Sequence, residues 1–420
     1  MKQSIKLILG GALLLALPMF LTSCDDILGE WSKPTPTVVT PEPGPEPAKN
    51  YRVYISGTAY SDEPIPAGAN VVGSSDADVT WDAETYVVDG NVTINGNVTF
   101  TRDVKLIIKD GAKLTVNGSM LGYDGVSIYY GLSIYGQKEN SGKLIINATN
   151  AGEYCLHAKS LEVHGCEINA ESKELFGIYT YNTILDHNIT IYSGKLTAKA
   201  GTSSAGDGQI GIGAFGNINV YGGNIIGIGA DGNGNTDDKV GIYAHGNITV
   251  KGGNVEATGG NGGSGLYSAG DITIDGNASV TATADGNNGI GIRANNIQIG
   301  QTGTPTVNAT GKNYGIRAVT QIDFIAGNVK GTSTGVMTQG GISSGQINYY
   351  GGSVEGEGGE GGVGIWGGAL GTITNKSGAT VTIGRRQYPT EGWTAEDVAD
   401  NAASTKYNRY MILPMPVAAP

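Results

Sequence analysis

The chain contains 420 residues, of which 38 are acidic and 26 are basic, so its formal net charge is −12 at pH 7. A chain with this excess of acid lacks the basic face that phosphate backbones require, and we therefore expect no nucleic-acid partner. Its 70 glycines separate many short apolar runs, and no helical period connects those runs. The pattern favours a fold made of short strands.

Residues 1–24 have the pattern of a targeting segment. Two lysines precede the apolar run Leu7–Leu21, which is too short and too interrupted by glycine and proline for a transmembrane helix. The run ends in the tetrapeptide LTSC, which resembles a bacterial lipobox and implies that Cys24 carries the lipid. Asp25 and Asp26 follow and resemble the export signal of Bacteroidetes-type surface lipoproteins. The resemblance implies an outer-membrane protein, exposed at the cell surface, that contacts the membrane through its lipid alone.

Residues 25–50 form a proline-rich stretch that cannot pack a core. Prolines hold such a chain near an extended polyproline conformation. We therefore predict a tether between the lipid and a folded domain that begins at residue 51.

One stretch of the folded region, Gly241–Thr258, defines a repeat. It reads GIYAHGNITVKGGNVEAT, in which apolar residues alternate within three short runs separated by turn residues. Each run is a strand signal, so one copy holds three strands and two tight corners. No single copy can enclose a core, so a repeat of this length indicates a solenoid. Further copies begin 20 to 34 residues apart, at Gly177, Gly211, Gly265, Gly291, Gly315, Gly335 and Gly364.

Stacking these copies predicts an all-β fold, a right-handed, single-stranded parallel β-helix with three strands per turn over residues 51–384. Residues 51–86 are its expected N-terminal cap, and 385–420 are a C-terminal capping segment with a short helix at Thr394–Ala402. The repeat resembles the pectate-lyase-like superfamily over about residues 80–384, a resemblance that is specific for fold and not for activity. The expected inward columns include Ile178, Ile212, Ile242, Leu266, Ile292, Ile316, Val336 and Ile365 on the first strand, and Ile218, Ile248 and Ile272 on the second.

Between the inward residues of each first strand lies one residue that points outward. In order these are His157, Tyr179, Gly213, Tyr243, Tyr267, Arg293, Arg317, Met337 and Trp366. The second strands present a small polar set, Glu162, Thr190, Asn219, Thr249, Thr273, Gln298, Asp323 and Asn348. Aromatic and arginine side chains one strand spacing apart form a flat ladder suited to sugar rings and acidic groups, although stacking for stability alone is the alternative. The predicted glycan-binding residues are His157, Tyr179, Tyr243, Tyr267, Arg293, Arg317 and Trp366.

A second candidate site lies in a polar loop. Asp231, Asn233, Asn235, Asp237 and Asp238 offer oxygen atoms mostly at alternate positions, as the first half of a calcium-binding EF-hand loop does. The second half departs from that pattern, because an isoleucine stands where the bidentate glutamate belongs. Calcium is therefore a candidate cofactor, and a polar loop without metal is the alternative.

Two patterns raise the alternative of an enzyme acting on acidic polysaccharide. The run Asn235–Asp238 followed by His245-Gly246 resembles polygalacturonase motifs, but that family's acidic residues lie on separate strands and these adjoin in one loop. Arg293 and Arg317 are basic residues of the kind that a polysaccharide lyase could use to take a proton, but no carboxylate ladder accompanies them. We therefore assign no catalytic residue.

Cys155 and Cys166 remain after lipidation of Cys24, in a compartment that permits disulfides. We expect them to be two separate buried residues, with a disulfide as the alternative.

Together these patterns predict a monomeric, adhesin-like surface lipoprotein whose partner is a polysaccharide or other glycan and which does not cleave it. A polysaccharide lyase or glycoside hydrolase, and a structural spacer of the cell envelope, are the alternatives.

Overall fold

The structure is a computed structural model that describes residues 49–415, except for 124–128, 150–153, 182–186, 203–208, 232–238, 337–339, 369–371, 389–390, 399–401 and 405–408. The described residues all belong to one compact unit, Pro47–Pro420. Every regular element within them is a β-strand, so the described residues contain no helix that could span a membrane. The predicted lipidation site Cys24 and residues 25–48 of the tether lie outside the described residues.

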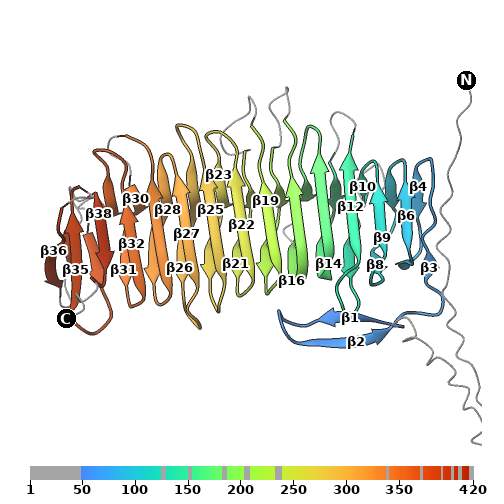
Figure 1. Cartoon of the computed structure of the whole chain (residues 1–420), viewed down its shortest axis with the longest axis horizontal. Coiled ribbons are helices and arrows are strands. Elements are labelled where there is room, and N and C mark those ends of the chain that lie inside the picture. The colour runs from blue at the N-terminus through green and yellow to red at the C-terminus, as the bar shows by residue number, and fades with distance from the viewer. Residues whose placement is uncertain are drawn as a thin grey trace, which may run out of the picture. The chain divides into compact units, whose positions relative to one another are not determined.

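The strands form a parallel β-solenoid of about ten turns (Figure 1). Each strand pairs in parallel with its equivalent one turn on, as Ile248 does with Ile218 on one side and Ile272 on the other. Because the repeats stack in this way, alternate side chains point into a common core and the others point outward. The all-β, parallel solenoid predicted from the repeat is confirmed.

Three faces run along the solenoid, and each collects one strand from every turn. The first face contains β4 (Val79–Trp81), β7 (Val98–Phe100), β10 (Met120–Leu121), β13 (Leu156–Ala158), β15 (Ile178–Thr180), β17 (Ile212–Ala214), β20 (Ile242–Ala244), β23 (Ser264–Ser268), β30 (Gly340–Ser344) and β33 (Val363–Gly367). The second contains β3 (Asn70–Val71), β5 (Thr85–Val88), β8 (Val104–Ile108), β11 (Leu132–Tyr135), β18 (Ile218–Val220), β21 (Ile248–Val250), β24 (Ile272–Ile274), β31 (Gln346–Tyr349) and β34 (Thr372–Asn375). The third contains β6 (Asn91–Ile94), β9 (Lys113–Val116), β12 (Lys143–Ala148), β19 (Asn224–Ile228), β22 (Asn254–Gly259), β25 (Ser279–Ala284), β27 (Thr306–Gly311), β29 (Asn328–Ser333) and β32 (Ser353–Glu357).

Four longer strands continue around a corner, and six lie outside this repeating pattern. The strands β14 (Leu161–Ser172) and β16 (Ile189–Lys199) join the second and third faces, whereas β26 (Ile290–Ile299) and β28 (Tyr314–Phe324) join the first and second. The others are β1 (Asn50–Tyr54), β2 (Tyr60–Pro64), β35 (Val381–Arg386), β36 (Thr394–Val398), β37 (Ala402–Ser404) and β38 (Tyr410–Leu413).

Two kinds of corner explain the turn residues of the repeat. Between the first and second faces, the side-chain oxygen of Asn217 accepts the N–H of Asn247 at 2.7 Å, and Asn247 in turn accepts the N–H of Asp271 at 2.9 Å. Between the second and third faces, Gly223 and Gly253 have φ angles of 89° and 80°. Residues with a side chain rarely adopt such backbone angles, so glycine is needed there.

The predicted first inward column is wrong at one turn. Val336 is 65 % exposed, whereas Ile342 is fully buried and pairs with its column neighbours on both sides. This repeat therefore begins at Gly341, six residues after the predicted start. Its outward residue is Ser343, and the predicted Met337 lies outside the described residues.

The hairpin of β1 and β2 lies along the corner between the second and third faces (Figure 1). The N–H of Arg52 donates to the carbonyl of Gly136 at 2.9 Å, and the N–H of Tyr54 donates to Nδ1 of His164 at 3.0 Å. The expectation that residues 51–86 cover the N-terminal end is therefore wrong for the hairpin. The strands β3 and β4, which each pair with one solenoid neighbour, form the outermost turn.

The C-terminal segment pairs with the last turns in antiparallel fashion. β38 pairs with β32 and β35, β37 pairs with β34, and β36 pairs with β35. The helix predicted at Thr394–Ala402 is wrong, because β36 occupies Thr394–Val398. The last strands of a solenoid expose unpaired N–H and C=O groups, and pairing with those groups favours a strand over a short isolated helix.

Candidate functional site

The structure places the predicted outward residues of the first strands in one column, which we call the outward ladder. Of its side chains, Arg317 is exposed, while the rings, Arg293 and Ser343 are partly buried. Parallel pairing joins His157, Tyr179, Gly213, Tyr243, Tyr267, Arg293, Arg317, Ser343 and Trp366 in this order.

One half of the ladder is aromatic. The rings of Phe176 and Tyr179 stack with centroids 4.3 Å apart, and the ring of Tyr154 stacks on Phe176 at 5.2 Å and on His157 at 4.6 Å. Phe176 and Tyr154 precede their strands by two residues, and the sequence analysis did not include them. Stacked rings of this kind stabilise one another and leave a flat apolar surface.

A second ring column, also missed from the sequence, lies beside the ladder. It consists of the residues that follow the first strand in three successive turns, Tyr181, Phe215 and His245. Phe215 stacks on His245 at 4.8 Å with ring planes 8° apart, and Tyr181 meets Phe215 edge-on at 5.4 Å. The signal in the sequence is a ring residue directly after the first strand in each of these three turns.

Gly213 has a specific role between the two halves of the ladder. A Cβ atom added to it would lie 2.5 Å from Cδ2 of Tyr179 and 2.8 Å from Cε2. The ring of Tyr179 therefore lies across the backbone of the next turn, and only glycine leaves it that space.

The other half of the ladder combines rings with cations. The rings of Tyr243 and Tyr267 are 5.3 Å apart, and the guanidinium carbon of Arg293 lies 4.5 Å from the ring centroid of Tyr267. The guanidinium carbon of Arg317 lies 4.9 Å from the ring centroid of Tyr314. Cation–π contact orients a guanidinium without using its five N–H donors, so Arg317, which forms no salt bridge with a described residue, can pair with a carboxylate.

His157 is an uncharged ring in this surface. Burial lowers its pKa to about 4, because the imidazolium loses its hydration there. At neutral pH the side chain therefore contributes ring surface to the aromatic half and no positive charge.

The predicted calcium loop lies largely outside the described residues. Asn233, Asn235, Asp237 and Asp238 are not described, whereas the carboxylate of Asp231 accepts the N–H of Asn261 at 2.6 Å. Within the described ranges, no group of three or more His, Cys, Asp or Glu side chains is arranged to hold a metal ion.

A separate ring stack follows the corner between the second and third faces. Tyr135, His164, Tyr192 and Tyr221 stack in order at 4.6, 4.5 and 5.2 Å. The hairpin covers the start of this stack, and Tyr51 meets Tyr135 edge-on at 5.0 Å. This stack therefore holds the hairpin, whereas the rings of the outward ladder stay partly open to solvent.

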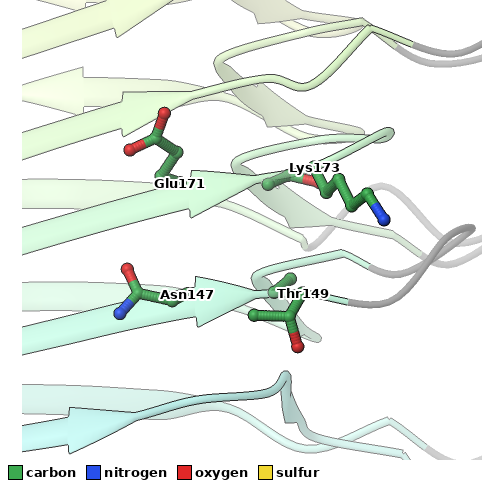
Figure 2. Close-up of a pocket in the computed structure, with 6 residues that line it drawn as sticks. Asn147, Thr149, Glu171 and Lys173 are labelled. Atoms are coloured by element: carbon green, nitrogen blue, oxygen red, sulfur yellow. The ribbon is translucent and has the colours of Figure 1, made fainter.

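A shallow polar pocket of about 400 Å³ opens where two strands of the third face end (Figure 2). Figure 2 shows Asn147 and Thr149 on one turn and Glu171 and Lys173 on the next, with the charged ends of the last two pointing apart. Glu171 already forms a salt bridge with Lys199 at 2.8 Å. The pocket therefore brings together no acid–base pair.

Cys155 and Cys166 are buried thiols, as expected, and no disulfide joins them. The thiol of Cys166 donates to the carbonyl of Tyr135 at 3.3 Å, and burial raises its pKa well above the usual range. It is therefore a structural residue and a poor nucleophile.

Comparison of the chain with protein-family models, with curated proteins and with solved structures finds no match.

Proposed function

We propose that this protein binds glycans, without cleaving them, along the outward ladder. The observation that carries the proposal is the chemical contrast between two faces of one solenoid. Between His157 and Trp366 the first face presents rings and guanidinium groups, interrupted at Gly213 and Ser343. The second face presents threonine, asparagine, glutamine and acidic residues at the equivalent position. Strand propensity alone would enrich aromatic residues on both faces.

The chemistry of the ladder suits a sugar chain that carries acidic groups. Partly exposed rings such as Tyr243 and Tyr267 can stack on the apolar faces of sugar rings, and Arg317 can donate two parallel hydrogen bonds to one carboxylate. The net charge of −12 does not prevent this pairing, because salt screens charges beyond about 8 Å at physiological ionic strength. Successive weak contacts along several turns add up to useful affinity.

The same proposal includes the location and the family. The lipobox ending at Cys24 and the two aspartates after it support a lipid-anchored, surface-exposed protein of the outer membrane. The parallel solenoid supports kinship with the pectate-lyase-like β-helices. A lyase or hydrolase would need catalytic groups other than the uncharged His157 and the carboxylate of Glu171, which is paired with Lys199. We therefore favour binding over cleavage.

The test compares two double variants on an array of acidic and neutral glycans, with and without calcium. Tyr243→Ala/Tyr267→Ala should weaken binding about tenfold or more, because two stacking rings are lost. The matched control, Thr249→Ala/Thr273→Ala, changes the equivalent outward positions on the second face and should leave binding unchanged.

Three results would contradict the proposal. Equal binding by both double variants would make the ladder purely structural, and failure of the parent protein to bind any glycan would favour the spacer. New reducing ends or unsaturated products after incubation with uronic-acid polymers would identify an enzyme.

A further inference from the structure

A groove away from the outward ladder separates the hairpin turn from the glycine corner of the solenoid. We call it the corner groove, and its volume is about 690 Å³, within the range of small-molecule sites. One wall is the turn between β1 and β2, and the floor is the corner between the second and third faces. Besides glycines of both segments, its lining includes Thr58 of the hairpin turn and Tyr221, Lys251 and Asn277 of the corner.

The hairpin wall is fixed in place at both ends. At one end, the N–H of Tyr54 donates to Nδ1 of the buried His164. At the other, a Cβ atom on Gly57 would overlap the carbonyl oxygen of Tyr221, so glycine brings the hairpin turn into backbone contact with the corner. The groove is therefore a formed feature of the fold.

The floor of the groove carries backbone donors without partners among the described residues. The N–H groups of Gly222, Gly223, Gly252 and Gly253 donate to no other described residue. Gly223 and Gly253 adopt positive φ, and successive N–H groups in such turns form concave anion sites.

One cation lines the same groove. Lys251 is exposed, and its Nζ lies 5.5 Å from the ring centroid of Tyr221. It forms no salt bridge with any described residue. The nearby Asp275 interacts with Lys251 electrostatically and partly compensates its charge, but the hydrogen bonds that its carboxylate accepts come from the N–H and the hydroxyl of Thr302 at 2.6 and 2.7 Å. An anion in the groove therefore meets an ammonium group and open amide donors together.

Acceptors in the same groove narrow the ligand class. The side chains of Thr58 and Asn277 line the rim, whereas the carbonyl oxygens of Tyr221 and Lys251 lie against the backbone of Gly57 and Gly276. Sulfate can only accept hydrogen bonds from these side chains, whereas the hydroxyls of a sugar can both donate and accept. We propose that the corner groove binds a uronic acid residue, with its carboxylate at Lys251 and its hydroxyls on the rim side chains. This site is separate from the outward ladder and does not depend on it.

The experiment is calorimetric titration of D-galacturonate and D-glucuronate at low ionic strength, with D-galactose and sulfate as comparison ligands. It is carried out in the Tyr243→Ala/Tyr267→Ala/Arg317→Gln background, which removes two rings and the exposed arginine of the outward ladder. Lys251→Met should raise the dissociation constant of the better uronate about tenfold or more, because a charge-assisted hydrogen bond is lost. Lys376→Met is the matched control, since Lys376 is exposed at a later turn of the same corner, away from the hairpin.

The outcomes separate this site from the ladder. Uronate binding that survives the ladder variant and falls with Lys251→Met, but not with Lys376→Met, supports the groove. Uronate binding that Lys251→Met does not affect, or no uronate binding in the ladder background, overturns the groove proposal. Either result does so whether or not the outward ladder binds glycans. Sulfate binding as tight as uronate binding, and equally dependent on Lys251, overturns the assignment to a sugar. Melting temperatures of both lysine variants equal to that of the background protein show that the fold is intact.

Discussion

Gly213→Ala should disturb the outward ladder without removing any of its rings. The new methyl would lie 2.5 Å from Cδ2 of Tyr179, well inside van der Waals contact, so the ring must swing away. Loss of its stack on Phe176 costs about 0.5–1.5 kcal/mol, and a ring that stays in place causes overpacking that costs about 1–3 kcal/mol. Alanine returns about 0.5–1 kcal/mol in a strand because it restricts the unfolded chain more than glycine does. We therefore expect a net loss of about 1 kcal/mol in the free energy of unfolding.

Urea unfolding of a double-mutant cycle tests this reasoning. In a Tyr179→Ala background the ring is gone, so Gly213→Ala should be neutral or slightly stabilising. The coupling between the two substitutions should then be about 1–2 kcal/mol, which is the net loss in the parent plus the gain that alanine brings once the ring is gone. The near-ultraviolet circular dichroism of Gly213→Ala should also change, because tyrosine and phenylalanine rings separate. An equal cost of Gly213→Ala in both backgrounds would refute the proposed contact.

Two further predictions concern the core and the anchor. Ile248→Asp should abolish cooperative folding, since it leaves an unpaired charge in the core between Ile218 and Ile272. Thr249→Asp, on the outward side of the same strand, should leave cooperative folding intact. Urea unfolding compares the two variants, and an Ile248→Asp variant that unfolds like the parent would contradict the inward column. Cys24→Ala should release the protein from the membrane fraction, because the lipid acceptor is lost; retention of the variant in that fraction would contradict the lipobox.

Much of the solenoid could be predicted because its pattern is local and repeated. An alternating apolar run specifies which side chains face inward, and the same run in the next copy specifies the register. The error at Gly335 has the same origin. Gly335-Val336 imitates the start of a copy, and only the burial of Ile342 six residues on shows where the strand lies.

The parts that the sequence did not predict depend on contacts between distant residues. The hairpin docks through Tyr54 on His164, which lies 110 residues away in the chain, and no period links the two. Phe176 and Tyr154 lie outside the alternating runs, so their stacking on the ladder follows from the geometry of the loops and not from strand register. The strand at Thr394–Val398 forms because β35 offers an unpaired edge, which outweighs a local capping pattern.

The place of the hairpin also bears on how an anchored protein could present the ladder. The hairpin begins at Asn50, the last residue of the predicted tether, and it docks at the corner between the second and third faces. Of the three corners of the solenoid, this is the one that does not border the first face. Attachment at the start of the hairpin therefore leaves the first face uncovered by the hairpin. A glycan along the outward ladder and a uronate in the corner groove would then occupy opposite sides of the same turns, and neither would need to displace the hairpin to bind.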